Sequence, residues 1–269
     1  MSGKAQTVDI DSGRVEGQAP SPAETWDAFF SDFYLRVAAG DERQERDAEA
    51  QALGAARLAG RPDGGDLLDV ACGFGRHAVP LAAAGYMVVG VDRSQTLLAE
   101  ARRRAGEGRW PELVQADYRE LPFADESFDA AINLFTSLGY FGDEEDTKAL
   151  AEIARVLRPD GRLVIEIMHR DLLVREFSEQ DWRALGGGRL LLEQRTFDAA
   201  AGVAQTTQTL IETSGERESR TFSLRVYTAT ELVAMLTAAG FAESKCYGDL
   251  DGRQLGTDTR LVIVARRGL

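Results

Sequence analysis

Two glycines and three carboxylates in the first half of the chain have types and spacing suited to holding a polar organic ligand. Asp69 is followed by Gly73 and Gly75, and Asp92 and Asp117 come later. Glycine lets the backbone turn and lets a ligand approach the main chain closely. Ionised carboxylates accept hydrogen bonds from hydroxyl and amino groups. These residues therefore predict a binding site, provided that the fold brings them together.

The segments around the glycines predict how they are positioned. Leu67, Leu68 and Val70 are apolar strand formers, typical of a buried parallel strand that ends at the glycine loop. A helix follows, and Pro80 must lie in its first turn, where a missing N–H is tolerated. We therefore expect this helix to start near Arg76 and to direct its unpaired N–H groups at the loop.

Strand and helix patterns alternate along the middle of the chain, which predicts an α/β fold with a parallel sheet covered on both faces. The expected strands are 66–71, 86–91, 112–116, 128–134 and 162–168, and the expected helices are 76–84, 95–105 and 144–157. Near the C-terminus we expect a helix over 230–239, a return to the sheet at Gly240-Phe241 and a final strand over 261–265.

The loop by itself is consistent with more than one nucleotide cofactor. Residues 73–78 also match the dinucleotide pattern G-x-G-x-x-G/A, and Asp92 ends the next strand at the distance expected of a ribose-binding acid. An NAD-binding enzyme therefore stays open as an alternative at this point.

Four features in order resemble the S-adenosylmethionine (SAM) site of the class I methyltransferases. They are the loop segment 67–77, Asp92, Asp117 after a third strand, and the segment 157–161, Leu-Arg-Pro-Asp-Gly, between a helix and a strand. The loop also lies well inside the chain, whereas dinucleotide-binding domains usually open with it. The resemblance implies a Rossmann-like fold, with a seven-stranded, mostly parallel sheet whose last strand is antiparallel and lies inside the edge.

The resemblance also implies residue roles and SAM as the cofactor. Asp92 would bind the ribose and Asp117 the adenine amino group, while Ala71 and Phe74 stand where many members have glycine and threonine. The cofactor contacts that we expect around the loop and the strand ends are Asp69, Ala71, Gly73, Gly75, Asp92, Arg93, Asp117, Tyr118 and Phe135.

We expect residues 1–22 to form a flexible tail and residues 23–269 to form a methyltransferase domain, which begins with helices over 23–60. The first of these helices carries aromatic residues at helical spacing, from Trp26 through Tyr34 to Val37. Such a stripe usually packs against the core. In related methyltransferases an N-terminal helix closes over SAM, so Trp26 and Tyr34 are also expected to contact the cofactor, where an aromatic ring can face the sulfonium.

Methyl transfer is an in-line displacement and depends mainly on holding the acceptor close, aligned and dry. A base is needed only when the acceptor must lose a proton first. His169 is the first candidate because it follows a strand at the carboxyl end of the sheet; a surface-loop histidine is the alternative. Tyr140, after the strand 128–134, is the second candidate.

Three strand-like runs between residues 186 and 227 predict an inserted antiparallel β meander. Its last run alternates, with Phe222, Leu224 and Val226 on one face and Arg225 on the other. We expect the meander to roof the acceptor pocket, with Arg225 contacting an anionic or carbonyl group. A role in a homodimer interface is the alternative.

Composition restricts the partners. The 269 residues contain 44% hydrophobic residues and carry a formal net charge of −13, which repels phosphate backbones and favours a small-molecule methyl acceptor over nucleic acid. The sequence shows no membrane-spanning run or signal peptide, and the two cysteines suggest no metal site, so we expect a cytoplasmic bacterial enzyme. A SAM-binding regulator or scaffold without transfer activity is the alternative function.

Overall fold

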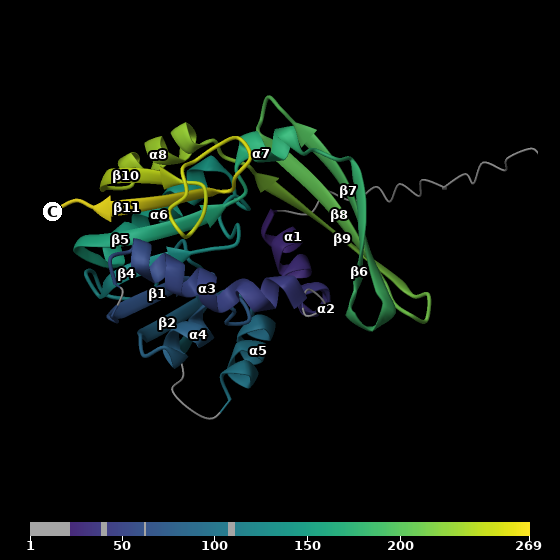
Figure 1. Ribbon diagram of the computed structural model, residues 1–269, viewed down its shortest axis with the longest axis horizontal. Coiled ribbons are helices and arrows are strands. Elements are labelled where there is room, and N and C mark those ends of the chain that lie inside the picture. The colour runs from purple at the N-terminus through teal and green to yellow at the C-terminus, as the bar shows by residue number, and fades with distance from the viewer. Residues whose placement is uncertain (1–21, 39–41, 62, 107–110) are drawn as a thin grey trace, which may run out of the picture.

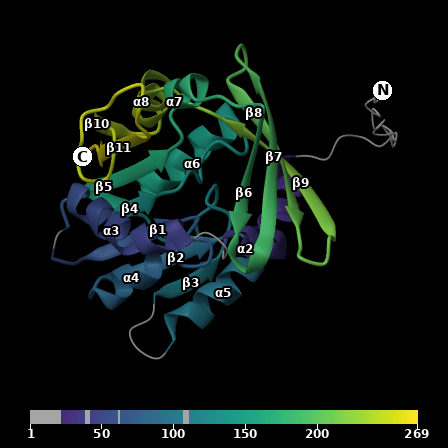
Figure 2. The same cartoon turned by 45° about the vertical axis from the view of Figure 1, so that its right-hand side comes forward.

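The computed structural model describes residues 22–38, 42–61, 63–106 and 111–269, which form two β-sheets with helices around the larger one (Figures 1 and 2). The central sheet has seven strands in the order β10-β11-β5-β4-β1-β2-β3. Strands β1 to β5 pair in parallel, and β11 is antiparallel to both neighbours. The predicted fold class is therefore confirmed. The strands are β1 (Asp66–Val70), β2 (Met87–Asp92), β3 (Glu112–Gln115), β4 (Phe128–Asn133), β5 (Leu157–Ile167), β10 (Phe241–Tyr247) and β11 (Leu261–Arg267).

Helices cover both faces of this sheet, because neighbouring strand residues point to opposite sides. Leu67 belongs to the buried cluster that contains Leu81 of α4, whereas Leu68 belongs to the cluster that contains Leu150 of α6. The helices are α3 (Glu42–Leu58), α4 (Ala78–Ala83) and α5 (Gln95–Ala105) on one side, and α6 (Asp143–Val156) and α8 (Ala229–Ala238) on the other. None of the described helices is both long and apolar enough to cross a bilayer.

Two predicted helices differ from those observed. The helix after the glycine loop begins at Ala78 rather than near Arg76, although Pro80 still lies in its first turn. The N-terminal aromatic segment forms two helices, α1 (Pro22–Phe29) and α2 (Asp32–Ala38). They separate where the Ser31 hydroxyl donates to the carbonyl of Ala28, since such a bond competes with the helical pattern. The predicted tail, apart from Pro22, falls outside the described residues.

The insertion is a separate antiparallel sheet of four strands, here called the roof sheet: β6 (Gln180–Leu185), β7 (Arg189–Asp198), β8 (Val203–Ile211) and β9 (Arg217–Arg225). The prediction of three strands beginning at residue 186 was wrong by one strand. β6 was missed because its charged and polar residues do not alternate with apolar ones and only Leu185 is buried. A short helix, α7 (Arg170–Arg175), connects β5 to the roof sheet.

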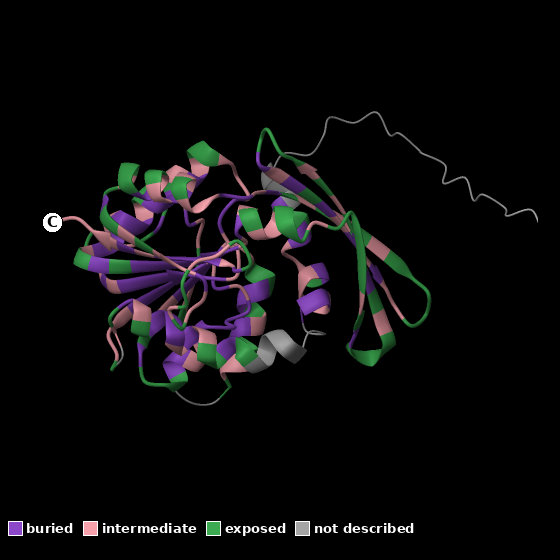
Figure 3. Ribbon diagram, turned by 45° about the horizontal axis from the view of Figure 1, so that its top comes forward, coloured by how far each residue is buried: buried purple, intermediate pink, exposed green. Residues whose placement is uncertain are grey.

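Helices α1 and α2 lie between the central sheet and the roof sheet (Figure 1). Phe29 and Phe33 pack against Leu185, Leu191 and Leu210 on the inner face of the roof sheet. Figure 3 shows buried residues through the central strands and exposed ones along the outer parts of the roof sheet. The aromatic stripe is therefore packed, as expected, and part of it faces the cavity described next.

Candidate functional site

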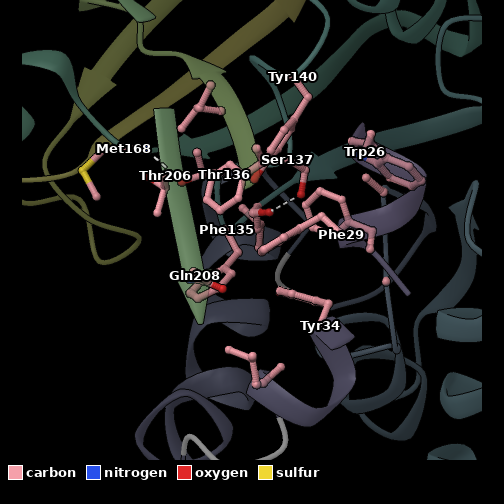
Figure 4. Close-up of a pocket in the computed structure, with 18 of the residues that line it drawn as sticks. Trp26, Phe29, Tyr34, Phe135, Thr136, Ser137, Tyr140, Met168, Thr206 and Gln208 are labelled. Atoms are coloured by element: carbon pink, nitrogen blue, oxygen red, sulfur yellow. Dashed lines mark hydrogen bonds between the residues drawn. The ribbon is translucent and has the colours of Figure 1, made fainter. Parts of the chain in front are cut away.

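A cavity of about 350 Å³ lies between the carboxyl ends of the central strands and the inner face of the roof sheet. The glycine loop forms one part of its wall. The loop after β4, helices α1 and α2, and the roof strands form other parts (Figure 4). Most of the wall is apolar, with a few charged side chains. Concave sites with a mostly apolar wall and a few placed polar groups are typical of small-molecule sites.

The residues of the glycine loop that have positive φ serve two different purposes, close packing and exposure of the backbone to a ligand. Ala71, Gly73 and Gly75 all have positive φ, at 58°, 54° and 77°. A Cβ on Gly75 would come within 2.9 Å of Val79 and 3.1 Å of Ala101, so this glycine permits close packing of the loop on the helices. Gly73 and Ala71 instead line the cavity. The loop is thus packed on one side by Gly75 and open to a ligand on the other at Gly73.

Asp92 connects the end of β2 to this loop. Its Oδ2 accepts from the backbone N–H of Gly73 and its Oδ1 from that of Ser94, both at 2.8 Å. The side chain is 4% exposed and lines the cavity, and burial raises its pKa to about 6. Each carboxylate oxygen has a further lone pair, so Asp92 can still accept hydrogen bonds from a ligand.

Asp69 lies behind the loop rather than on the cavity wall. The backbone N–H of Ala78 donates to its carboxyl group, and its Oδ2 has no partner among the described residues. Burial, reinforced by the charge of Asp92, raises the pKa of Asp69 to about 8. The structure thus gives Asp69 a role in holding the loop, and its predicted cofactor contact stays a prediction.

Replacing Asp69 with asparagine is expected to flatten the pH dependence of stability. In the unfolded chain Asp69 ionises near pH 3.8, whereas in the folded protein it stays protonated to about 8. Its contribution to stability is therefore complete below pH 4 and is lost as the pH rises to 8. The variant has no proton to lose there, so its Tm relative to wild type should rise by roughly 5 °C between pH 5 and pH 8.5, measured by circular dichroism. A constant difference would contradict the burial argument.

Asp117 and Arg93 lie outside the cavity wall, whereas Tyr118 is part of it. Both oxygens of Asp117 accept from the guanidinium of Arg119, at 2.6 and 2.9 Å, and Arg93 lies 3.7 Å from the same carboxylate. Arg93 also pairs with Asp27 at 2.9 Å. These residues form a chain of ion pairs, and the predicted adenine contact of Asp117 stays a prediction.

The loop after β4 holds two consecutive residues in the left-handed region, Phe135 and Thr136, with φ of 62° and 59°. A residue other than glycine in this region has a conformational cost of about 1–3 kcal/mol, and it persists only where the surrounding structure holds it. Glu166 accepts from the Phe135 N–H at 2.7 Å, and Arg260 donates to the Thr136 hydroxyl at 2.6 Å. Both residues of the turn line the cavity, as does Arg76, whose guanidinium lies 4.2 Å from the centre of the Phe135 ring. Sequence reasoning missed the contributions of Arg76 and Arg260, which come from distant segments.

The two expected aromatic contacts from the N-terminal helices, Trp26 and Tyr34, both line the cavity (Figure 4). Trp26 is 6% exposed, and burial raises the pKa of Tyr34 to about 12. Tyr34 is therefore a neutral, amphipathic wall residue.

The two candidate bases are in different situations. Tyr140 lines the cavity, but burial raises its pKa, so its phenol holds a proton instead of removing one. His169 follows β5 as expected but does not line the cavity. It is 3% exposed, with its Nε2 3.6 Å from a carboxylate oxygen of Asp171. His169 is thus neither a surface histidine nor in reach of the cavity in this conformation.

The expectation for Arg225 was wrong. Its guanidinium donates to Asp143 at 2.9 Å and to Glu231 at 2.6 Å, so it ties the end of β9 to α6 and α8. The alternation itself was predicted correctly, because Phe222 and Leu224 line the cavity. Arg225 projects from the opposite side of the strand, and these ion pairs occupy its guanidinium.

Sequence analysis did not predict the polar residues that the roof sheet brings to the cavity. In β7 the cavity face carries Leu191 and Glu193, whereas Leu190 and Leu192 are at least 36% exposed. Hydrophobicity alone therefore does not identify the cavity face of this strand. The polar side chains that the roof sheet contributes to the cavity wall are Arg183, Glu193, Arg195, Thr206 and Gln208.

Comparison with known proteins gives a family match over the glycine-loop half of the central sheet. A family model described as "Methyltransferase domain" matches residues 67–161. The demethylmenaquinone methyltransferase of Clavibacter sepedonicus is 46% identical over 100 residues, which are 37% of this chain and 39% of that protein. The chain thus spans only about two fifths of the length of this curated relative.

Similar solved structures cover far more of the chain. CalS10, an amino pentose methyltransferase from Micromonospora echinaspora solved with SAM bound, has 27% identity and a TM-score of 0.66, covering 87% of this chain and 96% of its own. The sugar N-methyltransferase KedS8 from a Streptoalloteichus species has 24% identity and a TM-score of 0.67, covering 98% and 100%. The 98% coverage by KedS8 extends the similarity of fold from residues 67–161 to nearly the whole chain.

Proposed function

We propose that this chain, which has the methyltransferase domain and the fold of the class I SAM-dependent methyltransferases, transfers a methyl group from SAM to a nitrogen atom of a small molecule. The observation that carries the proposal is the cavity itself. It reaches from Gly73 and Asp92 on one side to the roof sheet on the other, so a cofactor at the loop faces an acceptor site under the roof sheet.

The residues on the cofactor side fit SAM. Gly73 leaves its backbone open to a ligand, and Asp92 can accept hydrogen bonds from ribose hydroxyls. Tyr118 offers an aromatic face for the adenine. When bound, SAM supplies a methyl group made electrophilic by its sulfonium, and Trp26 and Tyr34 provide aromatic walls near which a positive charge is favourable.

The acceptor side favours nitrogen over oxygen, because an alcohol must lose its proton whereas a neutral amine attacks with its lone pair. Apart from Asp92, which this proposal assigns to the ribose, the described cavity residues include no effective base. Burial lowers the pKa of His77 to about 3 and raises those of Tyr34 and Tyr140. Glu193 is held by ion pairs with Arg183 and Arg195. The chain's part is then to align the amine, enclose it with aromatic side chains and exclude water.

The test combines binding and turnover. Calorimetry should detect binding of SAM and S-adenosylhomocysteine but not of NAD. Incubation with methyl-labelled SAM and a bacterial metabolite extract should then yield labelled products, identified by mass spectrometry, with the new methyl on nitrogen. SAM binding without labelled products would favour a regulator or scaffold, and binding of NAD alone would refute the cofactor assignment. Methylated alcohols or phenols would refute the preference for nitrogen.

A further inference from the structure

The inner face of the roof sheet changes from apolar to polar along its strands. One cross-strand row consists of Leu191 and Leu210, which pack against the N-terminal helices. In the next row into the cavity, Glu193 of β7 lies directly opposite Gln208 of β8, and both are less than 10% exposed. Burying polar side chains costs free energy unless they are paired, so their placement in an aromatic cavity calls for a reason.

Glu193 organises this row. Its Oε1 accepts from the Gln208 Nε2 at 2.6 Å, and its Oε2 accepts from Arg183 at 3.3 Å and from Arg195. The amide of Gln208 is thereby oriented, because the reverse orientation would bring two oxygens together. Both oxygens of Glu193 are occupied, and its charge is balanced within the row.

The row nevertheless ends in two polar atoms that are buried and unsatisfied by the part of the chain that the structure describes: the Gln208 Oε1, an acceptor, and the Arg183 Nε, a donor. Both residues line the cavity, and Figure 4 shows Gln208 and Thr206 on the roof strand facing it. A buried polar atom without a partner costs about 1–3 kcal/mol, so a ligand that satisfies these atoms gains affinity.

We infer that this row, Arg183–Glu193–Gln208, recognises hydroxyl groups on the methyl acceptor, so that the substrate is a hydroxylated amine. The inference rests on the proposed function. A hydroxyl group both donates and accepts, as the two unsatisfied atoms require. A carboxylate satisfies the arginine but has no proton to donate to the Gln208 carbonyl oxygen, and a hydrocarbon satisfies neither. The aromatic walls contact the carbon skeleton.

The test compares three amines that share a ring: cyclohexylamine, trans-4-aminocyclohexanol and trans-4-aminocyclohexanecarboxylate. Their dissociation constants are measured by ligand-observed NMR on the full chain saturated with S-adenosylhomocysteine. The wild-type protein should bind the amino alcohol about five- to tenfold more tightly than cyclohexylamine, the value of about one net hydrogen bond. In Gln208→Leu this preference should disappear. The matched control is Gln205→Leu, an exposed glutamine of the same strand, which should keep the full preference.

Three results with the wild-type protein would overturn the inference. They are equal affinity for cyclohexylamine and the amino alcohol, tightest binding of the carboxylate, and no binding of any of the three amines. A preference that survives in Gln208→Leu would do the same. S-adenosylhomocysteine affinity and Tm are measured in each sample. If the wild-type protein binds S-adenosylhomocysteine but shows no preference among the amines, the hydroxyl inference alone is refuted. If the wild-type protein does not bind S-adenosylhomocysteine, the proposed function is refuted.

Discussion

Replacing Asp92 with alanine is expected to weaken SAM binding by roughly 10- to 150-fold, equivalent to about 1.5–3 kcal/mol. The carboxylate accepts from Gly73 and Ser94 and faces the cavity, so its removal takes away the proposed ribose partner and also frees the loop that forms this part of the cavity wall. Calorimetry well below the Tm measures the loss.

Two further variants separate the cofactor contact from general effects. Asp92→Asn keeps the size of the side chain but directs an NH₂ group at one of the two backbone donors, so we expect an intermediate loss. Glu112→Ala removes an exposed acid at the start of β3 and should leave SAM affinity unchanged. An unchanged affinity in Asp92→Ala would mean that the ribose is held elsewhere.

Replacing Gly75 with alanine is expected to destabilise the protein by about 2–4 kcal/mol, since the new methyl group overlaps Val79 and Ala101 and the residue has a φ of 77°. Urea unfolding followed by circular dichroism gives the free energy. The effect falls on stability because Gly75 packs against helices and does not line the cavity.

Gly73→Ala is the matched variant in the same loop. Its φ is 54°, and the nearest side-chain atom to an added Cβ is 3.9 Å away, so the stability loss should be only about 1 kcal/mol. Because Gly73 lines the cavity, this variant should instead weaken SAM binding. Equal destabilisation by the two substitutions would contradict the division of the loop into a packed side and a ligand side.

The central sheet could be predicted because its inner strands are buried on both faces and its turns carry local signals. Leu67, Leu68 and Val70 are apolar strand formers, Asp92 ends β2, and Gly75 lies in the loop that follows β1. Sequence therefore located the glycine loop and Asp92 correctly. The start of α4 was less certain, since Pro80 limits the first turn but does not set its first residue.

The acceptor side could not be predicted in the same way, because its residues are chosen by tertiary contacts. Arg225 has the features of a binding residue in sequence, yet Asp143 and Glu231, brought close by folding, occupy its guanidinium. Glu193 has the features of a surface residue but lies 7% exposed in the cavity wall. Which face of a half-exposed strand such as β7 becomes buried depends on the elements that pack against it. The local sequence pattern holds no information about those elements.

The position of α1 and α2 between the two sheets has a consequence for how the protein is made. Arg36 of α2 pairs with Glu218 of the roof sheet, which follows it by 182 residues in sequence. A chain emerging from the ribosome therefore presents the aromatic surface of Phe29 and Phe33 long before the strands that bury it exist. During synthesis this surface is open to other hydrophobic partners, chaperones among them, and the wall of the cavity is completed only after most of the chain has been released.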